Sequence, residues 1–144
     1  MIVPDVNILV YAYNQDAPHH RVARRWWEDT LSVTESVVGL TWVTCLGYMR
    51  LTTNRRVLLH PWNAVEAIEH IRTWLSRPHV QLLQPGPCHL DIMAGFAAAG
   101  ILTSELTTDA HLAAMAIEYQ GTVYSNDGDF ARFPGLRHQN PLRR

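Results

Sequence analysis

The sequence predicts a three-layer α/β domain with a mostly parallel central sheet and helices on both of its faces. Strand-like segments alternate with segments of helical periodicity along the whole chain, which is the order expected of βαβ units. The strand-like segments are short and apolar, as expected where both faces of a sheet are covered. A length of 144 residues fits one domain of this kind, so we expect a single domain over residues 1–144.

The amino-terminal part of the chain is predicted to contain two strands and three helices. Residues 1–5 form a short buried strand, and a helix starting at Asp5 follows over VNILVYAYN. Residues 18–31 have helical periodicity. Their inward positions are Val22, Ala23, Trp26 and Trp27, and their outward positions are Arg21, Arg24, Arg25 and Glu28. SVVGLT at 36–41 is strand-like, and residues 42–51 are again helical.

The carboxyl-terminal part continues the same alternation. Pro61 suits the first turn of a helix that ends near Ser76. The apolar positions of that helix are Val65, Ile68, Ile71 and Leu75. The remaining elements are a strand at 79–83, a helix at 88–99 before Gly100, an alanine-rich helix at 108–120 before Gly121, a clear strand at 122–126 and a weak strand at 136–139.

Composition restricts the class of protein without naming a function. The formal net charge of −1 gives no global basic field for nucleic acid. All twelve basic residues are arginine, which fits codon bias and also phosphate recognition. Cys45 and Cys88 lack metal-ligand spacing, so we expect small buried thiols in a reducing compartment. The sequence has no apolar run of membrane-spanning length and no basic region before its apolar start, so we expect a cytoplasmic protein without a membrane partner.

Aspartates stand at several junctions between the predicted elements. Asp5 ends the first strand, Asp109 opens the alanine-rich helix in LTTDAHLAA, and Asp127 and Asp129 follow a strand in SNDGDF. In a parallel sheet, Asp5 and Asp127 would lie at the same edge, and a helix packed there could bring Asp109 to them. Each also has a structural explanation alone. Asp5 could cap a helix, Asp109 could be a favourable first-turn charge, and the other two could be turn residues.

Convergence of these carboxylates would favour a cation site. Carboxylates packed together repel one another, and a divalent cation removes that repulsion. The candidate ligands are hard oxygen atoms, with no histidine or cysteine at ligand spacing, which favours Mg²⁺ or Mn²⁺ over Zn²⁺. Such an ion can activate water and stabilise a phosphoryl transition state.

Three segments of the chain resemble the PIN-domain family. They are PDVNILVYAYN at the start, TTDAHLAAMAIEYQG in the last third, and SNDGDFARFPGLR after it. The sequence HHRVARRWWED, after the first motif, is also similar. The best match is to the VapC-type ribonuclease toxins of toxin–antitoxin pairs, and the order and spacing of the motifs agree over nearly the full length.

The resemblance implies a Mg²⁺- or Mn²⁺-dependent endoribonuclease with a PIN-like α/β/α fold. By motif, Asp5 and Asp109 carry over as metal ligands, Asp127 as the last acidic position, Asp129 as an assisting neighbour, and Asn7 as a residue that orders the loop. Water activated by the metal would attack an RNA phosphodiester in line. The resemblance also implies a homodimer and a cognate VapB-type antitoxin whose tail lies across the acidic groove.

One position departs from the family pattern. The family usually places a glutamate on the helix after the second strand, a few residues before an arginine. In TWVTCLGYMR the corresponding residue is Gly47, and residues 36–65 contain no acidic residue. Water or another residue such as Glu105 could take the place of the missing ligand, because Mg²⁺ tolerates several waters. Gly47 could also serve close helix packing.

Arginines near the same helix are candidates for RNA binding. Arg50, Arg55 and Arg56 lie in RLTTNRR, and an acidic pocket needs flanking cations to hold RNA. They could equally belong to a solvated loop.

Three hypotheses follow from these residues. The first is a metal-dependent ribonuclease toxin. The second is a catalytically weakened PIN module that binds RNA or a protein partner, because Gly47 lacks the carboxylate. The third is a receiver-like signalling domain with a phosphoacceptor aspartate, against which the absence of lysine counts.

Overall fold

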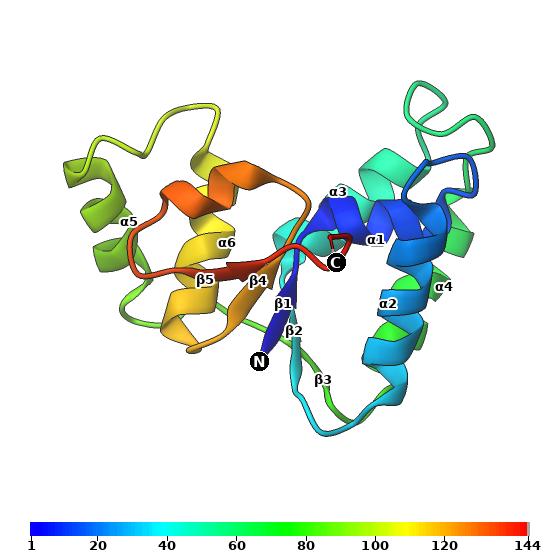
Figure 1. The fold of residues 1–144 in the computed structure, drawn as a ribbon, viewed down its shortest axis with the longest axis horizontal. Helices are drawn as coiled ribbons and strands as arrows, with labels where there is room; N and C mark the ends of the chain where they lie inside the picture. Colours follow the sequence, from blue (N-terminus) through cyan, green and yellow to red (C-terminus); the bar gives the residue numbers. More distant parts are fainter. Residues whose placement is uncertain (144) are drawn as a thin grey trace.

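A computed structural model describes residues 1–143 of the chain. Its strands and helices follow the predicted order closely (Figure 1). The strands are β1 (Ile2–Pro4), β2 (Val38–Leu40), β3 (Val80–Leu82), β4 (Thr122–Tyr124) and β5 (Arg137–Gln139). The helices are α1 (Val6–Tyr13), α2 (His20–Ser32), α3 (Trp42–Thr52), α4 (Ala64–Leu75), α5 (His89–Ala98), α6 (Thr107–Glu118) and a 3₁₀ helix, η1 (Gly128–Arg132).

The five strands form one sheet in the order β3-β2-β1-β4-β5, and every neighbouring pair is parallel. The prediction of a mostly parallel sheet is therefore confirmed. In the register of the central pair, Pro4 at the end of β1 lies opposite Tyr124 at the end of β4. The residues that follow these two strands consequently leave the sheet at the same edge, which is where ligands bind in sheets of this type.

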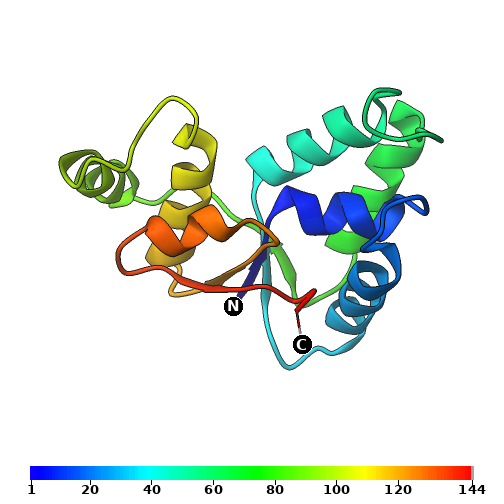
Figure 2. The ribbon, with the colours of Figure 1, turned by 45° about the horizontal axis from the view of Figure 1, so that its top comes forward.

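Helices cover both faces of the sheet. Figures 1 and 2 show α1 to α4 on one side and α5, α6 and η1 on the other. Each layer has its own apolar core. One cluster joins β2 to α1–α4, and the other joins Val3 and Val123 to α5, α6 and η1. The predicted three-layer arrangement is confirmed, and the central strands lie between the two cores.

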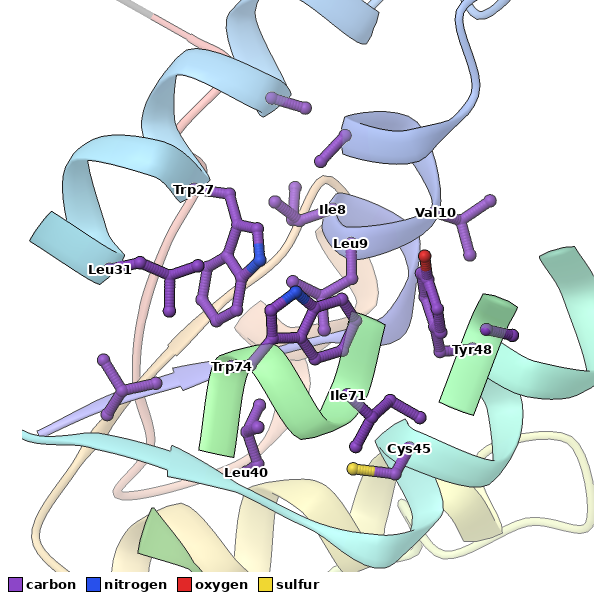
Figure 3. Packing of buried hydrophobic residues seen from close by; sticks show 14 of the residues in the cluster. Ile8, Leu9, Val10, Trp27, Leu31, Leu40, Cys45, Tyr48, Ile71 and Trp74 are labelled. Atoms are coloured by element: carbon purple, nitrogen blue, oxygen red, sulfur yellow. The ribbon is translucent and has the colours of Figure 1, made fainter. Parts of the chain in front are cut away.

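Aromatic side chains dominate the larger core. Trp27 of α2, Trp74 of α4 and Tyr48 of α3 are almost completely buried and lie together beneath α1 (Figure 3). The ring centroids of Trp27 and Trp74 are 5.5 Å apart and those of Tyr48 and Trp74 are 4.7 Å apart, both in edge-to-face geometry. Such pairs add about 0.5–1.5 kcal/mol to the free energy gained by burial alone. This core holds α1 in place, and with it the β1–α1 junction.

Several finer predictions are wrong. In α4, Val65 and Ile68 are exposed, whereas Ile71 is buried as predicted, together with Ala67 and Trp74. The large indole of Trp74 anchors the helix, so the buried face includes Trp74 and excludes the first two predicted positions. The helix also begins after Asn63 and not at Pro61, because Asn63 and Glu66 form a reciprocal capping box.

Three other expectations of burial also fail. Val22 of α2 is exposed to 43%, although Ala23 and Trp27 are buried as predicted. Cys88 is an exposed thiol, whereas Cys45 is buried. All three residues of β5 are exposed, because this edge strand is not covered on both faces. None of the helices described between residues 1 and 143 is long and apolar enough to cross a membrane.

Candidate active site

Asp5 lies where β1 passes into α1. Its backbone N–H donates to the carbonyl of Tyr124 at 2.9 Å, which ties this junction to the end of β4. Its side chain caps α1, because Oδ1 accepts a 2.7 Å hydrogen bond from the backbone N–H of Val6. Asp5 is only 8% exposed. The capping explanation is thus confirmed, and it leaves the carboxylate at the carboxyl end of the sheet.

Ser125 connects the two motifs at this edge. Its hydroxyl donates to Oδ2 of Asp5 at 2.7 Å. The hydroxyl oxygen of Ser125 also accepts hydrogen bonds from Nδ2 of Asn7 at 3.2 Å and from the backbone N–H of Asp127 at 2.9 Å. One buried hydroxyl therefore fixes the carboxylate of Asp5, the amide of Asn7 and the start of the loop after β4.

The NDGD loop turns through its own aspartates. Oδ1 of Asp127 accepts from the backbone N–H of Asp129 at 2.9 Å and caps η1. The turn explanation for these residues is therefore confirmed as well. Their carboxylates can still bind a ligand, because each aspartate has two oxygens with several lone pairs and the turn uses only one oxygen of Asp127.

Asp109 completes the group from the first turn of α6. Single oxygens of Asp109, Asp127 and Asp129 all lie within 4.8 Å of one another. Asp5 and Asp109 line a common hollow of about 50 Å³ with Val6 and Thr44. The structure thus brings together the four aspartates singled out by the sequence. Three of them form the compact oxygen group, and Asp5 lies beside it.

The electrostatics of this group favour a bound cation. Burial, followed by the charges of Asp5, Asp127 and Asp129, raises the pKa of Asp109 to about 6. Burial also raises the pKa of Asp5, against the hydrogen bonds from Ser125 and Val6. Repulsion of this kind is relieved by a divalent cation among the oxygens. The acidic cluster has the chemistry of a metal site.

A larger open hollow of about 530 Å³ lies over the cluster. The residues on its rim are Thr103, Ser104 and Glu105 from the loop before α6, and Arg132 at the end of η1. Nη1 of Arg132 lies 3.9 Å from Oδ1 of Asp129, and both side chains are about half exposed. One loosely held arginine cannot neutralise three carboxylates, so the hollow remains acidic.

Gly47 of α3 lies against α1 next to the acidic group. A Cβ atom at this position would lie 3.2 Å from Cγ2 of Val6, which is a tight contact. A side chain at position 47 would therefore require the side chain of Val6 to shift slightly. The packing explanation for this glycine is confirmed. Glu105 is the acidic residue outside the four aspartates that lines the larger hollow.

The predicted arginines are placed differently from the aspartates. Arg50, Arg55 and Arg56 are exposed at the end of α3 and in the following turn. None of them lines the hollows that contain Asp5, Asp109 or Asp127. Arg132 and Arg143 line those hollows in their stead. Sequence reasoning also missed Ser125, although a serine at the end of a buried strand and directly before NDGD was a usable signal.

A PIN-domain family model matches residues 2–136. The chain belongs to the PIN-domain family. It is 46% identical over 143 residues to Ribonuclease VapC33 of Mycobacterium tuberculosis, with 99% of both chains covered. It is 36% identical over 141 residues to Ribonuclease VapC37 of the same organism, with 98% of this chain and 97% of the relative covered. The chain is a homologue of the VapC ribonucleases, and this excludes the receiver-like hypothesis.

The fold is also similar to that of solved toxin–antitoxin complexes. The structure of VapBC2 from Rickettsia felis, bound to a DNA fragment from the promoter, matches with a TM-score of 0.68. The match covers 97% of this chain and 98% of the other at 17% identity. At that identity the likeness supports the fold, and the family assignment rests on the sequence relatives.

Proposed function

We propose that this PIN-domain protein is a divalent-metal-dependent endoribonuclease and the toxin of a type II toxin–antitoxin pair. The observation that carries the proposal is the group of Asp109, Asp127 and Asp129, whose oxygens lie within 4.8 Å of one another. The sequence relationship to the VapC ribonucleases over the full length supports the same reaction class.

The residues present fit Mg²⁺ or Mn²⁺. All candidate ligands are carboxylate oxygens, which these hard ions prefer. Asp109, Asp127 and Asp129 would hold the ion, and Asp5 would act beside them through the lone pairs that its two hydrogen bonds leave available. A bound ion of this kind supplies an activated water and stabilises charge on the phosphoryl group.

The chain itself orients the groups around the phosphodiester. Ser125 and the cap to Val6 hold the carboxylate of Asp5 in one direction. Asn7 holds the loop after β4, because its Oδ1 accepts from the backbone N–H of Asn126 at 3.4 Å. Arg132 at the rim of the hollow offers a cation to a phosphate near the cluster. We propose Arg50, Arg55 and Arg56 as a more distant RNA-contacting segment.

The proposed partners are RNA, a second copy of the chain and a cognate VapB-type antitoxin, in the cytoplasm. The antitoxin is supported by the similarity of the fold to a VapBC complex. A homodimer is supported by exposed apolar side chains, including Trp42 and Leu46 of α3, since exposed apolar patches commonly mark interfaces. We also propose that residues 1–144 form one domain.

Metal-dependent cleavage of RNA by the purified protein tests the proposal. Asp109→Asn should abolish cleavage in Mg²⁺ and in Mn²⁺, whereas Asp91→Asn, an exposed aspartate of α5, should leave the rate unchanged. Chelation should stop cleavage and added Mn²⁺ should restore it. Cleavage by the Asp109 variant at the parental rate would show that the acidic group is not the active site.

A second candidate function is a weakened PIN module that binds RNA or a protein partner and cleaves slowly. The absence of a carboxylate at Gly47, where a Cβ atom would lie only 3.2 Å from Cγ2 of Val6, favours it. The two functions are distinguished by the cleavage rate under single-turnover conditions in saturating Mn²⁺.

A further inference from the structure

Another hollow lies between the loop after β4 and the tail after β5, next to the acidic hollow of about 530 Å³ and smaller than it. Its volume is about 150 Å³. The polar residues that line it include Asn126, Asp127, His138, Gln139, Asn140 and Arg143. Asp127 lines this hollow and the acidic one, so the two are neighbours at the carboxyl edge of the sheet.

Two amides of this hollow, those of Asn126 and Asn140, have a fixed orientation. The backbone N–H of Leu142 donates to Oδ1 of Asn140 at 3.0 Å, which identifies that atom as the oxygen. Nδ2 of Asn140 then donates to Oδ1 of Asn126 at 2.9 Å. The side-chain nitrogen of Asn126 therefore points away from this chain of bonds, with two hydrogens left for a ligand. Donors are thus placed in the wall of the hollow before any ligand arrives.

The tail that forms one wall is held in place. Leu142 packs against the larger apolar core, and Figure 1 shows the tail running from β5 toward the α1–α4 layer. The backbone N–H of Arg143 also donates to the carbonyl of Asn140 at 3.3 Å. These anchors hold the backbone of Arg143 beside the amides, and its side chain lines the hollow. A built wall of this kind costs little ordering entropy when a ligand binds.

The two hollows differ in charge, and the difference suits two different parts of a nucleotide. The acidic hollow holds three aspartates and Glu105 against one arginine. The smaller hollow holds one carboxylate, one arginine and neutral amide groups. A nucleotide whose phosphate lies at the acidic cluster could therefore place its base in the smaller hollow without meeting further negative charge. Unpaired RNA bases are recognised by hydrogen bonds to their edges, which amides provide.

We propose that this hollow is a subsite for one unpaired RNA base, next to the phosphate at the acidic cluster. The proposal rests on the proposed ribonuclease function and names the part of the substrate that the neighbouring surface reads. The donors of Asn126 and Arg143 face an acceptor edge of the base, and guanine presents two adjacent acceptors, O6 and N7. The exposed side chain of Gln139 also lines the hollow, and its amide can donate to or accept from another edge of the base.

The test is a binding experiment that needs no cleavage. Guanosine 5′-monophosphate and ribose 5-phosphate are titrated into the ¹⁵N-labelled full chain in Mg²⁺, and the side-chain amide signals of Asn126 and Gln139 are followed by NMR. The nucleotide should bind at least about fivefold more tightly than the sugar phosphate, and the two amide signals should shift with the nucleotide alone. Equal affinities, or shifts confined to other residues, would overturn the proposal.

Two variants sharpen the result. Asn126→Asp keeps the oxygen that accepts from Asn140 and removes the donors, so the ratio of the two affinities should fall by about fivefold or more. Because the ratio is compared, the added charge near the phosphate cancels. Asn63→Asp is the matched control, since Asn63 caps α4, lines neither hollow, and can be replaced by an aspartate that caps equally well; it should leave the ratio unchanged. An unchanged ratio in Asn126→Asp would contradict the proposal.

The base subsite and the ribonuclease function can be contradicted independently of each other. Base-dependent binding at Asn126 by a protein that cleaves no RNA would support this subsite and contradict the ribonuclease. RNA cleavage by a protein without base-dependent binding here would support the ribonuclease and overturn the subsite.

Discussion

The hydroxyl of Ser125 donates a 2.7 Å hydrogen bond to Oδ2 of Asp5, although the two residues are 120 positions apart in the chain. Both lie just beyond the ends of β1 and β4, which are adjacent parallel strands. The pair is nearly buried, with Ser125 only 4% exposed. This bond makes the first and last motifs of the chain one structural unit.

Ser125→Ala should therefore damage both stability and cleavage. It removes the donor to Asp5 and the acceptor for Asn7 and the backbone N–H of Asp127. Leaving buried polar groups without partners costs roughly 1–3 kcal/mol, so the free energy of unfolding should fall by about that amount. Denaturant unfolding and the cleavage rate measure the two effects. Ser125→Thr keeps the hydroxyl and should recover most of both, and Ser36→Ala, at an exposed serine before β2, is the control.

The pKa of Asp109 predicts how the stability of the metal-free protein depends on pH. Its value in the folded protein is about 6, raised from 3.8 by burial and by the neighbouring aspartates. Between these values the folded state holds a proton that the unfolded state has lost. The free energy of unfolding should therefore fall as the pH rises from 4 toward 7. Denaturation midpoints of metal-free protein at several pH values measure this dependence.

Asp109→Asn should weaken that pH dependence, because the amide does not titrate. The exposed Asp91→Asn should retain it. Added Mg²⁺ or Mn²⁺ should flatten the curve of the parental protein by stabilising the ionised carboxylates. Identical pH dependence in the parental protein and in Asp109→Asn would show that the repulsion within the acidic group is not significant.

The contact between Gly47 and Val6 predicts the outcome of adding the carboxylate that the family usually carries. Gly47→Glu alone should cost about 1 kcal/mol of stability, because its Cβ would lie 3.2 Å from Cγ2 of Val6. Val6→Ala combined with Gly47→Glu relieves the contact. The double variant should bind Mn²⁺ more tightly by calorimetry than Val6→Ala alone. If it does not, the weakened-module hypothesis loses its physical basis.

Much of the fold could be predicted from the sequence, because local patterns carry it. Apolar strands, alanine-rich helices and glycine stops located the five strands and the helices α1–α6 to within a few residues, whereas the short 3₁₀ helix η1 was predicted only as a turn. The buried face of α4 could not be predicted from spacing, because Trp74 is buried by packing against Trp27 and Tyr48, which are distant in the sequence. In the same way, Cys88 lies in an apolar segment yet faces solvent, since α5 packs mainly on α6 alone.

The candidate site was predictable to the level of its aspartates. Their positions after parallel strands imply a common edge, and the structure brings them together. The hydrogen bonds through Ser125 and the hollow at Asn126 and Asn140 were not predictable, because they join residues from three separate segments. Nor could spacing show that Arg143, and not Arg55 or Arg56, lines a hollow at this edge.

The aromatic core predicts a matched pair of tryptophan substitutions. Trp74 is completely buried against Trp27, Tyr48 and Tyr13, and its Nε1–H donates to the hydroxyl of Tyr13 at 2.8 Å. Trp74→Ala should lower the free energy of unfolding by about 3–5 kcal/mol. Trp42 of α3 is 50% exposed, so Trp42→Ala should change it by no more than about 0.5 kcal/mol in the monomer. Denaturant unfolding at low protein concentration compares the two, and a similar loss in both variants would mean that the core does not hold α4 against α1 in this way.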